Sequence, residues 1–259
     1  MKKIDTHPIS ITKKEYWQGA ISELYNTRKL CTAALLIALS IVLQKISLVI
    51  VPGLKVQITF IVASLSGVLL GPVLNAIRGA VADLLGYVIA PEGAFYVGYT
   101  VQSAFAGFVY SLFFYRKKIT FPRIILGKGA ISLFSNAIFG SALKTIYYTS
   151  VRTFPAFLLA FSASLAKQIL LFPAEVVIIL LVFNSLLPAL QVMKLAYYPE
   201  RVIFNKKTII SLVIISVWVL LGILFFTFAP EELKTSMSDA VKSATASIKA
   251  FFNRILGIE

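Results

Sequence analysis

Residues 71–100, GPVLNAIRGAVADLLGYVIAPEGAFYVGYT, place two opposite charges, Arg78 and Asp83, inside an apolar run that suits hydrocarbon. The run ends in a Pro-Glu-Gly turn that leads into aromatic residues. Arg78 and Asp83 are five residues apart, about 140° around a helix, so they make a poor ion pair with each other. We expect each to find a partner elsewhere in a bundle or to reach an interface. Arg78 is near enough to the cytoplasmic end of its helix to snorkel, and Asp83 is expected to take hydrogen bonds from neighbouring helices.

The sequence around this stretch has the composition of a membrane protein. Of its 259 residues, 58% are hydrophobic and 14% are charged, whereas a soluble domain averages roughly 25% charged residues. The mean hydropathy is +0.86. Several apolar runs reach the roughly 20 residues that cross about 30 Å of hydrocarbon, and they are continuous rather than alternating, which argues against a closed barrel. The predicted fold class is therefore all-α, a polytopic bundle of membrane helices.

Seven spans are expected, at about residues 30–50, 57–71, 72–90, 94–115, 127–149, 155–190 and 208–229. The sixth is too long for a simple crossing, so it either projects beyond the bilayer or bends at Pro173. Residues 231–259 follow with apolar side chains at spacings of three and four, which predicts an amphipathic helix along the outer membrane surface. A partner-binding or poorly ordered tail is the alternative.

The net charge of +14 follows from topology and does not indicate nucleic-acid binding. Basic residues collect in the gaps between apolar runs, and by the positive-inside rule this places the N-terminus in the cytoplasm. The expected divisions are a cytoplasmic segment 1–28, a six-helix membrane domain 29–195, an extra span with its preceding loop 196–230, and the tail 231–259. The basic residues that define the cytoplasmic loops include Arg28, Lys29, Arg116, Lys117, Lys118, Arg123, Lys128, Lys194, Arg201, Lys206 and Lys207.

Catalytic and metal chemistry find little support in the sequence. The chain has one cysteine, Cys31, and one histidine, His7, which makes a Cys/His metal site very unfavourable. It has no GxxxxGK[ST] loop for ATP. The start of the chain lacks the cleavage pattern of a removable signal peptide. We therefore expect neither an enzyme nor a bound cofactor, and any ATP-driven step would need another subunit.

Charged residues placed by depth indicate a cavity that opens to the outside. Lysines and an arginine gather toward the outer side, and aromatic residues reach the same level. This combination suits a flat anionic ligand, with its ring against aromatic faces and its carboxylates near ammonium groups. Snorkelling and an interfacial tyrosine belt are the alternative for most of these residues. The gathered residues are Lys45, Lys55, Lys144, Arg152, Lys167, Phe95, Tyr96, Tyr99, Tyr147 and Tyr148.

Two charges in the sixth span receive separate interpretations. Lys167 has apolar neighbours on both sides in FSASLAKQILLFPAEVV, and an ionisable group in such a segment is expected to be functional, here by contacting the ligand. Glu175 lies two turns further along, about 12 Å on an ideal helix. We expect it to pair with another helix rather than to relay protons.

Three stretches carry a resemblance to a known family: RKLCTAALLIALSIVLQKI (28–46), VQITFIVASLSGVLLGPVLNAIRGAVADLLG (56–86) and PEGAFYVGYTVQSAFAGFVYSLFFYRKK (91–118). With them stand the motifs Gly71-Pro72, Asp83-Leu84-Leu85-Gly86 and Gly98-Tyr99-Thr100, and Asn136 with Gly140 and Thr145. Over roughly residues 28–192 the chain resembles the substrate-binding S-components of energy-coupling factor (ECF) vitamin transporters, and within them the folate-specific branch.

This resemblance implies a six-helix subunit that captures folate or a related pterin from outside. It would deliver the ligand inward with a transmembrane coupling protein and two cytoplasmic ATPase subunits, in contact with membrane lipid and without nucleic acid. Ala34 and Ala38 match the small-residue motif that faces the coupling protein. Residues 45–57 correspond to a gating loop. The expected contacts are Lys144 and Lys167 to carboxylates, Phe95, Tyr96 and Tyr99 to the ring, Asn136 and Gln168 to its hydrogen-bonding edge, and Thr100 and Lys55 as further members of the site.

The chain departs from the family pattern in three places. The folate branch commonly carries Arg-x-x-Lys in the sixth helix, where this chain has Ser164 and Lys167. Arg78 stands where a small or apolar residue is usual, and the seventh span and tail extend beyond the family's normal end. Two alternatives therefore stay open: an S-component for another vitamin or small aromatic metabolite, and a stand-alone membrane assembly or lipid-handling factor.

Overall fold

The computed structural model describes residues 11–51, 54–89, 91, 93–148 and 153–192, together with the isolated residues 210, 213, 214 and 217. Apart from those four residues, the predicted seventh span and the whole predicted amphipathic tail lie outside the described part of the chain. So does Arg152.

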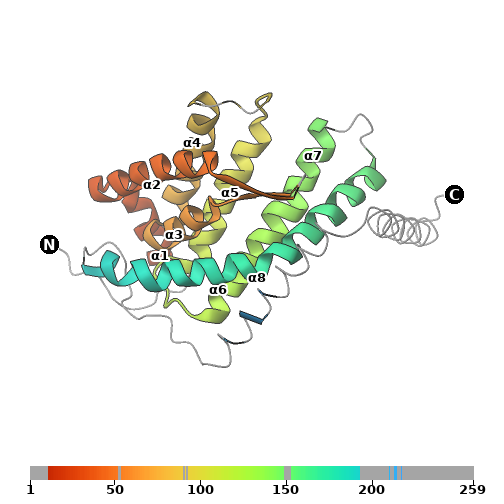
Figure 1. The fold of residues 1–259 in the computed structure, drawn as a ribbon. Helices are drawn as coiled ribbons and strands as arrows, with labels where there is room; N and C mark the ends of the chain where they lie inside the picture. Colours follow the sequence, from red (N-terminus) through yellow and green to blue (C-terminus); the bar gives the residue numbers. More distant parts are fainter. Residues whose placement is uncertain are drawn as a thin grey trace.

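The described chain is a bundle of helices with one small hairpin (Figure 1). Five of its helical segments are long and apolar enough to cross a membrane, namely Thr27–Lys45, Pro72–Ile89, Val97–Phe114, Phe121–Tyr147 and Leu171–Leu190. The predicted all-α class is confirmed. The elements are α1 (Lys14–Ser22), the 3-10 helix η1 (Glu23–Tyr25), α2 (Thr27–Lys45), β1 (Ser47–Val51), β2 (Leu54–Gln57), α3 (Phe60–Leu69), α4 (Pro72–Ile89), α5 (Val97–Phe114), α6 (Phe121–Ala130), the π-helix η2 (Ile131–Phe139), α7 (Gly140–Tyr148) and α8 (Phe154–Val192).

The hairpin occupies the segment that the family resemblance identifies with a gating loop. Strands β1 and β2 pair antiparallel, with Ser47 opposite Gln57 and Val49 opposite Lys55. The β-branched residues of SLVIV favour an extended backbone, although this segment was not predicted as strand. We call the part of the bundle next to this connection the hairpin end.

The helices agree with the predicted spans in number and order over the described part of the chain, but the first and the fifth differ most in extent. The first ends at Lys45, because residues 47–51 form β1. The fifth predicted span begins earlier, because α6, η2 and α7 form one continuous helical segment from Phe121 to Tyr148. The sixth is α8, a helix of 39 residues that runs unbroken past Pro173. Its length is about 58 Å at 1.5 Å per residue, more than a bilayer core, and Figure 1 shows it changing direction along its course.

Two glycines let α4 and α5 approach closely. A Cβ atom at Gly79 would clash with the backbone carbonyl of Ser103, and one at Gly107 would clash with the carbonyl of Asn75. The Asn75 side chain uses this proximity, since its Nδ2 donates to the Gly107 carbonyl at 2.8 Å and to Ser111 Oγ at 2.9 Å. The α4–α5 pair is thus a rigid wall against which polar side chains can be fixed.

Large apolar side chains fill the centre of the bundle and also cover its outside. Val62, Ile124 and Phe183 belong to the buried core. Leu35 and Val88 are 72% and 75% exposed. An apolar outer surface of this kind is unfavourable in water and typical of contact with lipid.

The N-terminal segment packs onto the bundle through α1. Tyr16, Ala20 and Tyr115 form a small buried cluster, in which the Tyr16 and Tyr115 rings meet edge to face at 5.5 Å. Burial raises the pKa of the Tyr16 phenol above its ordinary value, so this side chain stays neutral. The part of segment 1–28 that the structure describes is therefore joined to the helices that follow.

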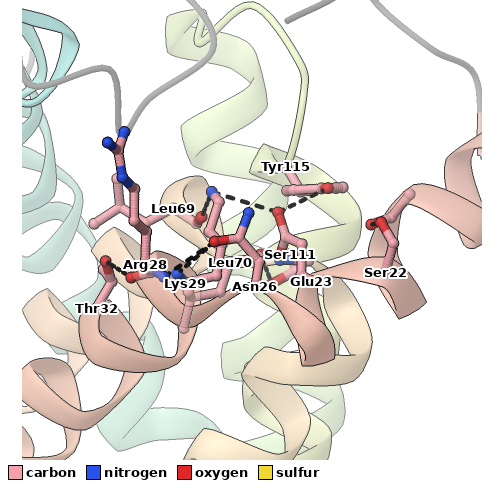
Figure 2. Close-up of polar contacts among 12 residues, drawn as sticks. Ser22, Glu23, Asn26, Arg28, Lys29, Thr32, Leu69, Leu70, Ser111 and Tyr115 are labelled. Carbon is pink, nitrogen blue, oxygen red and sulfur yellow. Dashed lines mark hydrogen bonds and ion pairs between the residues drawn. The ribbon is translucent and has the colours of Figure 1, made fainter. Parts of the chain in front are cut away.

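A polar cluster around Glu23 closes the opposite end of the bundle, which we call the η1 end (Figure 2). The buried Glu23 carboxylate accepts hydrogen bonds from the Gly71 backbone N–H at 2.6 Å and from the Tyr115 hydroxyl at 3.0 Å. Lys29 Nζ lies 3.4 Å from Glu23 Oε1 and also donates to the Leu69 carbonyl. Figure 2 shows Lys29 and Tyr115 approaching Glu23 from either side. The cluster ties η1 to the α3–α4 turn and to the end of α5.

Candidate ligand-binding cavity

A cavity of about 690 Å³ lies inside the bundle, between residues of α2, α3, α4 and α5 and residues of α6, η2 and α8. Its lining begins at the hairpin end with Lys45, Thr59 and residues 94–96, and reaches Gly107 and Glu175 inside. A second cavity of about 170 Å³ is lined by residues of α5, η2, α7 and α8. The two share five lining residues, so they form one connected site. Their volumes suit a small organic ligand.

The structure brings seven of the nine predicted substrate-binding residues to these cavities. Tyr99, Asn136, Lys167 and Gln168 line both, Phe95 and Tyr96 line the larger one, and Lys144 lines the smaller one. The two exceptions are Thr100, which is in neither lining, and Lys55, whose side chain lies outside the described part of the chain.

Two lysines mark the smaller cavity. Lys144 on α7 is exposed and Lys167 on α8 is half-buried, and both line this space. Lys144 Nζ donates a hydrogen bond to Ser164 Oγ at 3.1 Å, and Ser164 occupies the position where the family pattern has arginine. The Lys144 ammonium group thus reaches from α7 to α8 at this position. A carboxylate placed between the two lysines would be stabilised by both charges.

Amide side chains connect the lysines to the centre of the cavity. Asn136 Nδ2 donates to Gln168 Oε1 at 3.3 Å, which links η2 to α8. Gln102 Nε2 donates to the backbone carbonyl of Ser135 at 2.8 Å. Both Ser135 and Asn136 belong to the π-helix η2, an irregular helix type that is frequent at functional sites. Nothing in the sequence pattern predicted this irregularity.

Aromatic residues line the hairpin end of the cavity, as expected. The Tyr96 and Tyr147 rings stack with centroids 4.2 Å apart, and Phe95 packs on Tyr87 at 5.1 Å. Gly93 in the preceding Pro-Glu-Gly turn has a φ of 86°, a left-handed conformation that favours glycine. The turn therefore redirects the chain from α4 so that residues 95 and 96 reach the cavity wall.

Asp83 is hydrogen-bonded from a neighbouring helix, which confirms that expectation. Thr100 Oγ1 on α5 donates to Asp83 Oδ2 at 2.7 Å, and Ser103 Oγ lies 3.5 Å from Asp83 Oδ1. Asp83 itself lines the larger cavity. Thr100 thus positions a wall residue of the cavity and does not form part of the wall.

Arg78 has partners elsewhere in the bundle, one of the two outcomes expected for it, and it does not snorkel. The side chain is only 5% exposed and lines the larger cavity. Its Nε donates to Asn75 Oδ1 at 2.8 Å, and its Nη1 donates to Ser40 Oγ on α2 at 3.0 Å. The reason is local: acceptors one turn back and on the adjacent helix hold the guanidinium inside the bundle.

Lys128 was predicted to lie in a cytoplasmic loop, and this prediction was wrong. It lies in α6, is 1% exposed, and forms an ion pair of 2.7 Å with Glu175 on α8. Its Nζ also lies 5.1 Å from the centre of the Phe60 ring. The expected interhelical partner of Glu175 is confirmed. Both members of the pair line the larger cavity, where the sequence had suggested neither.

The predicted docking residues Ala34 and Ala38 lie on an exposed face of α2. Leu35 and Leu39, which are also exposed, accompany them.

An apolar helical bundle around a polar, cation-bearing cavity defines a membrane-embedded protein that binds a small molecule. Residues 28–186 match the family described as "ECF transporter, substrate-specific component", and the chain belongs to this family. The resemblance seen in the sequence is thereby confirmed, and the protein is a multi-pass membrane protein.

Individual relatives and one solved structure agree with the family. The chain is 32% identical to the folate transporter FolT of Clostridium novyi over 146 residues, which cover 56% of this chain and 82% of the relative. It is 29% identical to the folate transporter FolT of Leuconostoc mesenteroides over 161 residues, 62% and 86% of the two chains. The crystal structure of FolT bound with folic acid is similar with a TM-score of 0.54 and 27% identity, covering 62% of this chain and 95% of that one.

Proposed function

We propose that this chain is the substrate-capture subunit of an ECF-type importer and binds folate or a related pterin. The observation that carries the proposal is the connected cavity, which joins two lysines, amide side chains and an aromatic wall within one membrane bundle. The names of the relatives, folate transporters, and the solved relative with bound folic acid support the same ligand. In this proposal the chain binds and releases its ligand, and catalysis plays no part.

The residue roles follow from the chemistry of the lining. Lys144 and Lys167 hold the ligand's carboxylates, because two ammonium groups in a site of low dielectric attract an anion strongly. Tyr96 and Tyr99 stack on the ring, with Phe95 beside them. Asn136 and Gln168 exchange hydrogen bonds with the ligand's polar edge, and Lys55 in β2 is a further member of the proposed site.

Family membership supports a proposal for the assembly. We propose that the N-terminus is cytoplasmic and that residues 29–195 form the substrate-binding domain, followed by the extra span 196–230 and the tail 231–259. The exposed face of α2 with Ala34 and Ala38 would dock a transmembrane coupling protein, since small residues let helices approach closely in lipid. Two cytoplasmic ATPases would drive the cycle. Purification from a host that expresses these subunits should recover them with the chain, and their absence would favour a stand-alone membrane factor.

Ligand binding by the purified protein tests the proposal directly. Folate should bind, and Lys167→Ala should weaken its affinity at least tenfold, about 1.4 kcal/mol. Lys14→Ala is the matched control, because Lys14 is exposed on α1, outside both cavity linings, and its affinity should not change. A folded protein that binds neither folate nor a pterin refutes the function. Unchanged affinity of Lys167→Ala removes this residue from the site.

One observation favours a second candidate, an S-component for a different vitamin or small aromatic metabolite. Ser164 stands in place of the arginine that the folate branch commonly carries, so the smaller cavity is less strongly cationic than in that pattern. Competition of a panel of vitamins against labelled folate separates the two candidates. Displacement by another vitamin at lower concentration than folate would favour the second.

A further inference from the structure

Arg78 is a buried cation in the cavity wall, and the side chains that contact it are neutral. Its guanidinium donates hydrogen bonds to the Asn75 amide oxygen and the Ser40 hydroxyl. Among the described residues, no carboxylate lies within ion-pair distance of its guanidinium, and the nearby Asp83 is engaged by Thr100. Lys128, which is buried in the same cavity wall, has Glu175 as its partner.

An uncompensated charge at this depth is costly. Moving an ion out of water costs several kcal/mol even after relaxation, and ionisable residues in membrane helices are retained chiefly where they serve a function. The cost therefore indicates that a negatively polarised partner is supplied from outside the chain.

The guanidinium is also held in a fixed orientation. Asn75 accepts from Arg78 Nε while its own Nδ2 is fixed by the Gly107 carbonyl and Ser111 Oγ. Ser111 Oγ in turn donates to the Leu70 carbonyl. An arginine has five N–H donors, and these contacts use two of them. Because Arg78 lines the larger cavity, the remaining donors are available to a ligand there.

Arg78 and Lys144 lie on different sides of the site, whereas Lys167 lines both cavities. Arg78 belongs to α4 and Lys144 to α7, and Figure 1 shows these helices on either side of α5. Lys144 lines the smaller cavity and Arg78 only the larger one. A ligand that places its carboxylates between Lys144 and Lys167 therefore turns its other end toward Arg78.

We propose that Arg78 is a specificity-determining residue that donates hydrogen bonds to the oxo group on the heterocyclic end of the ligand. The inference rests on the proposed function and adds to it the ring end of the site. A pterin ring presents a carbonyl oxygen beside a ring nitrogen, and arginine reads the same pair of acceptors on the O6 and N7 edge of guanine. The planar guanidinium matches two parallel acceptors, which lysine cannot do.

A structural role for Arg78 makes the opposite prediction for stability. If the guanidinium served only to join α4 to α2, Arg78→Met would lower the melting temperature and leave affinity unchanged. In our proposal the unliganded protein keeps or gains thermal stability in Arg78→Met, because an uncompensated buried charge has been removed, while ligand affinity falls.

The test compares folic acid with aminopterin, its analogue with an amino group in place of the 4-oxo group. The wild-type protein should prefer folic acid at least tenfold, because the amino group cannot accept a hydrogen bond from Arg78. Arg78→Met should bring this ratio close to one, and Arg78→Lys should give an intermediate ratio. Lys167→Ala should weaken both ligands by the same factor and preserve the ratio.

Several outcomes overturn the inference without touching the proposed function. These are a wild-type protein that binds both ligands equally, and an Arg78→Met or Arg78→Lys variant that keeps the wild-type preference. If Arg78→Met lowers the affinity for folic acid and for aminopterin by the same factor, Arg78 contacts a part that both ligands share, such as the carboxylates. That result also overturns the inference. If the wild-type protein binds neither ligand, the proposed function itself has failed.

Discussion

Glu23 at the η1 end and Arg78 in the cavity wall are both buried charges, with exposed fractions of 4% and 5%. Glu23 is surrounded by donors of three kinds, a backbone N–H, a phenol and an ammonium group. Arg78 is bound by an amide and a hydroxyl, and the structure offers it no opposite charge among the described residues. The first cluster is complete without any ligand. The second is complete only when a ligand is present, which is the difference between a structural site and a binding site.

The Lys128–Glu175 pair extends this comparison. It lines the same cavity as Arg78, but, like Glu23, each of its charged groups has an oppositely charged partner within the chain. Glu175→Ala leaves the Lys128 ammonium buried and unpaired, so we expect the free energy of unfolding to fall by about 3 kcal/mol or more. The measurement is thermal unfolding of the purified protein in detergent. This is the largest stability effect that we predict.

The double variant Lys128→Met with Glu175→Leu is the matched control for that prediction. Because it removes both charges, it should recover most of the lost stability. If the double variant is as unstable as Glu175→Ala, the pair stabilises through packing or shape, and charge compensation is not the explanation.

Disrupting the Glu23 cluster should lower the free energy of unfolding somewhat less than Glu175→Ala does. Glu23→Gln keeps the shape of the side chain and removes its charge, which weakens the contacts with Lys29 and the Gly71 N–H. We expect a loss of about 2 kcal/mol, the usual value of hydrogen bonds to a charged group. Folate affinity should stay unchanged, since Glu23 lines neither cavity. A tenfold fall in affinity would contradict the separation between the structural cluster and the binding site.

The smallest predicted effect concerns a single neutral donor in the same cluster. Tyr115→Phe removes the hydroxyl that donates to Glu23 and keeps the ring that packs on Tyr16. The expected loss is about 1 kcal/mol. Tyr25→Phe serves as its control, because Tyr25 is 86% exposed, and its melting temperature should match that of the wild type. Equal melting temperatures for the two variants would show that the Tyr115 hydroxyl contributes nothing.

Most of the fold could be predicted from the sequence, because an apolar run long enough to cross the bilayer core predicts a membrane-spanning helix. The same logic placed Lys144 and Lys167 at one level and led to the cavity they share. It failed at Lys128, where nearby basic residues suggested a loop although an interhelical carboxylate keeps the lysine buried. At Arg78 it left two outcomes open, because depth along one helix gives no information about an acceptor on another, here Ser40. Partners from distant segments decide such cases.

The π-helix η2 sets the rotational phase between the two ends of one continuous helical segment. In a regular α-helix, Lys128 and Lys144 are 16 residues apart and would point about 160° away from each other. A π turn takes up more residues than an α turn, so every side chain after η2 is turned back relative to those before it. Both lysines consequently reach the connected cavities. The alignment of cations in this site is thus a property of helical phase, and deleting one residue from η2 would swing α7 around its own axis.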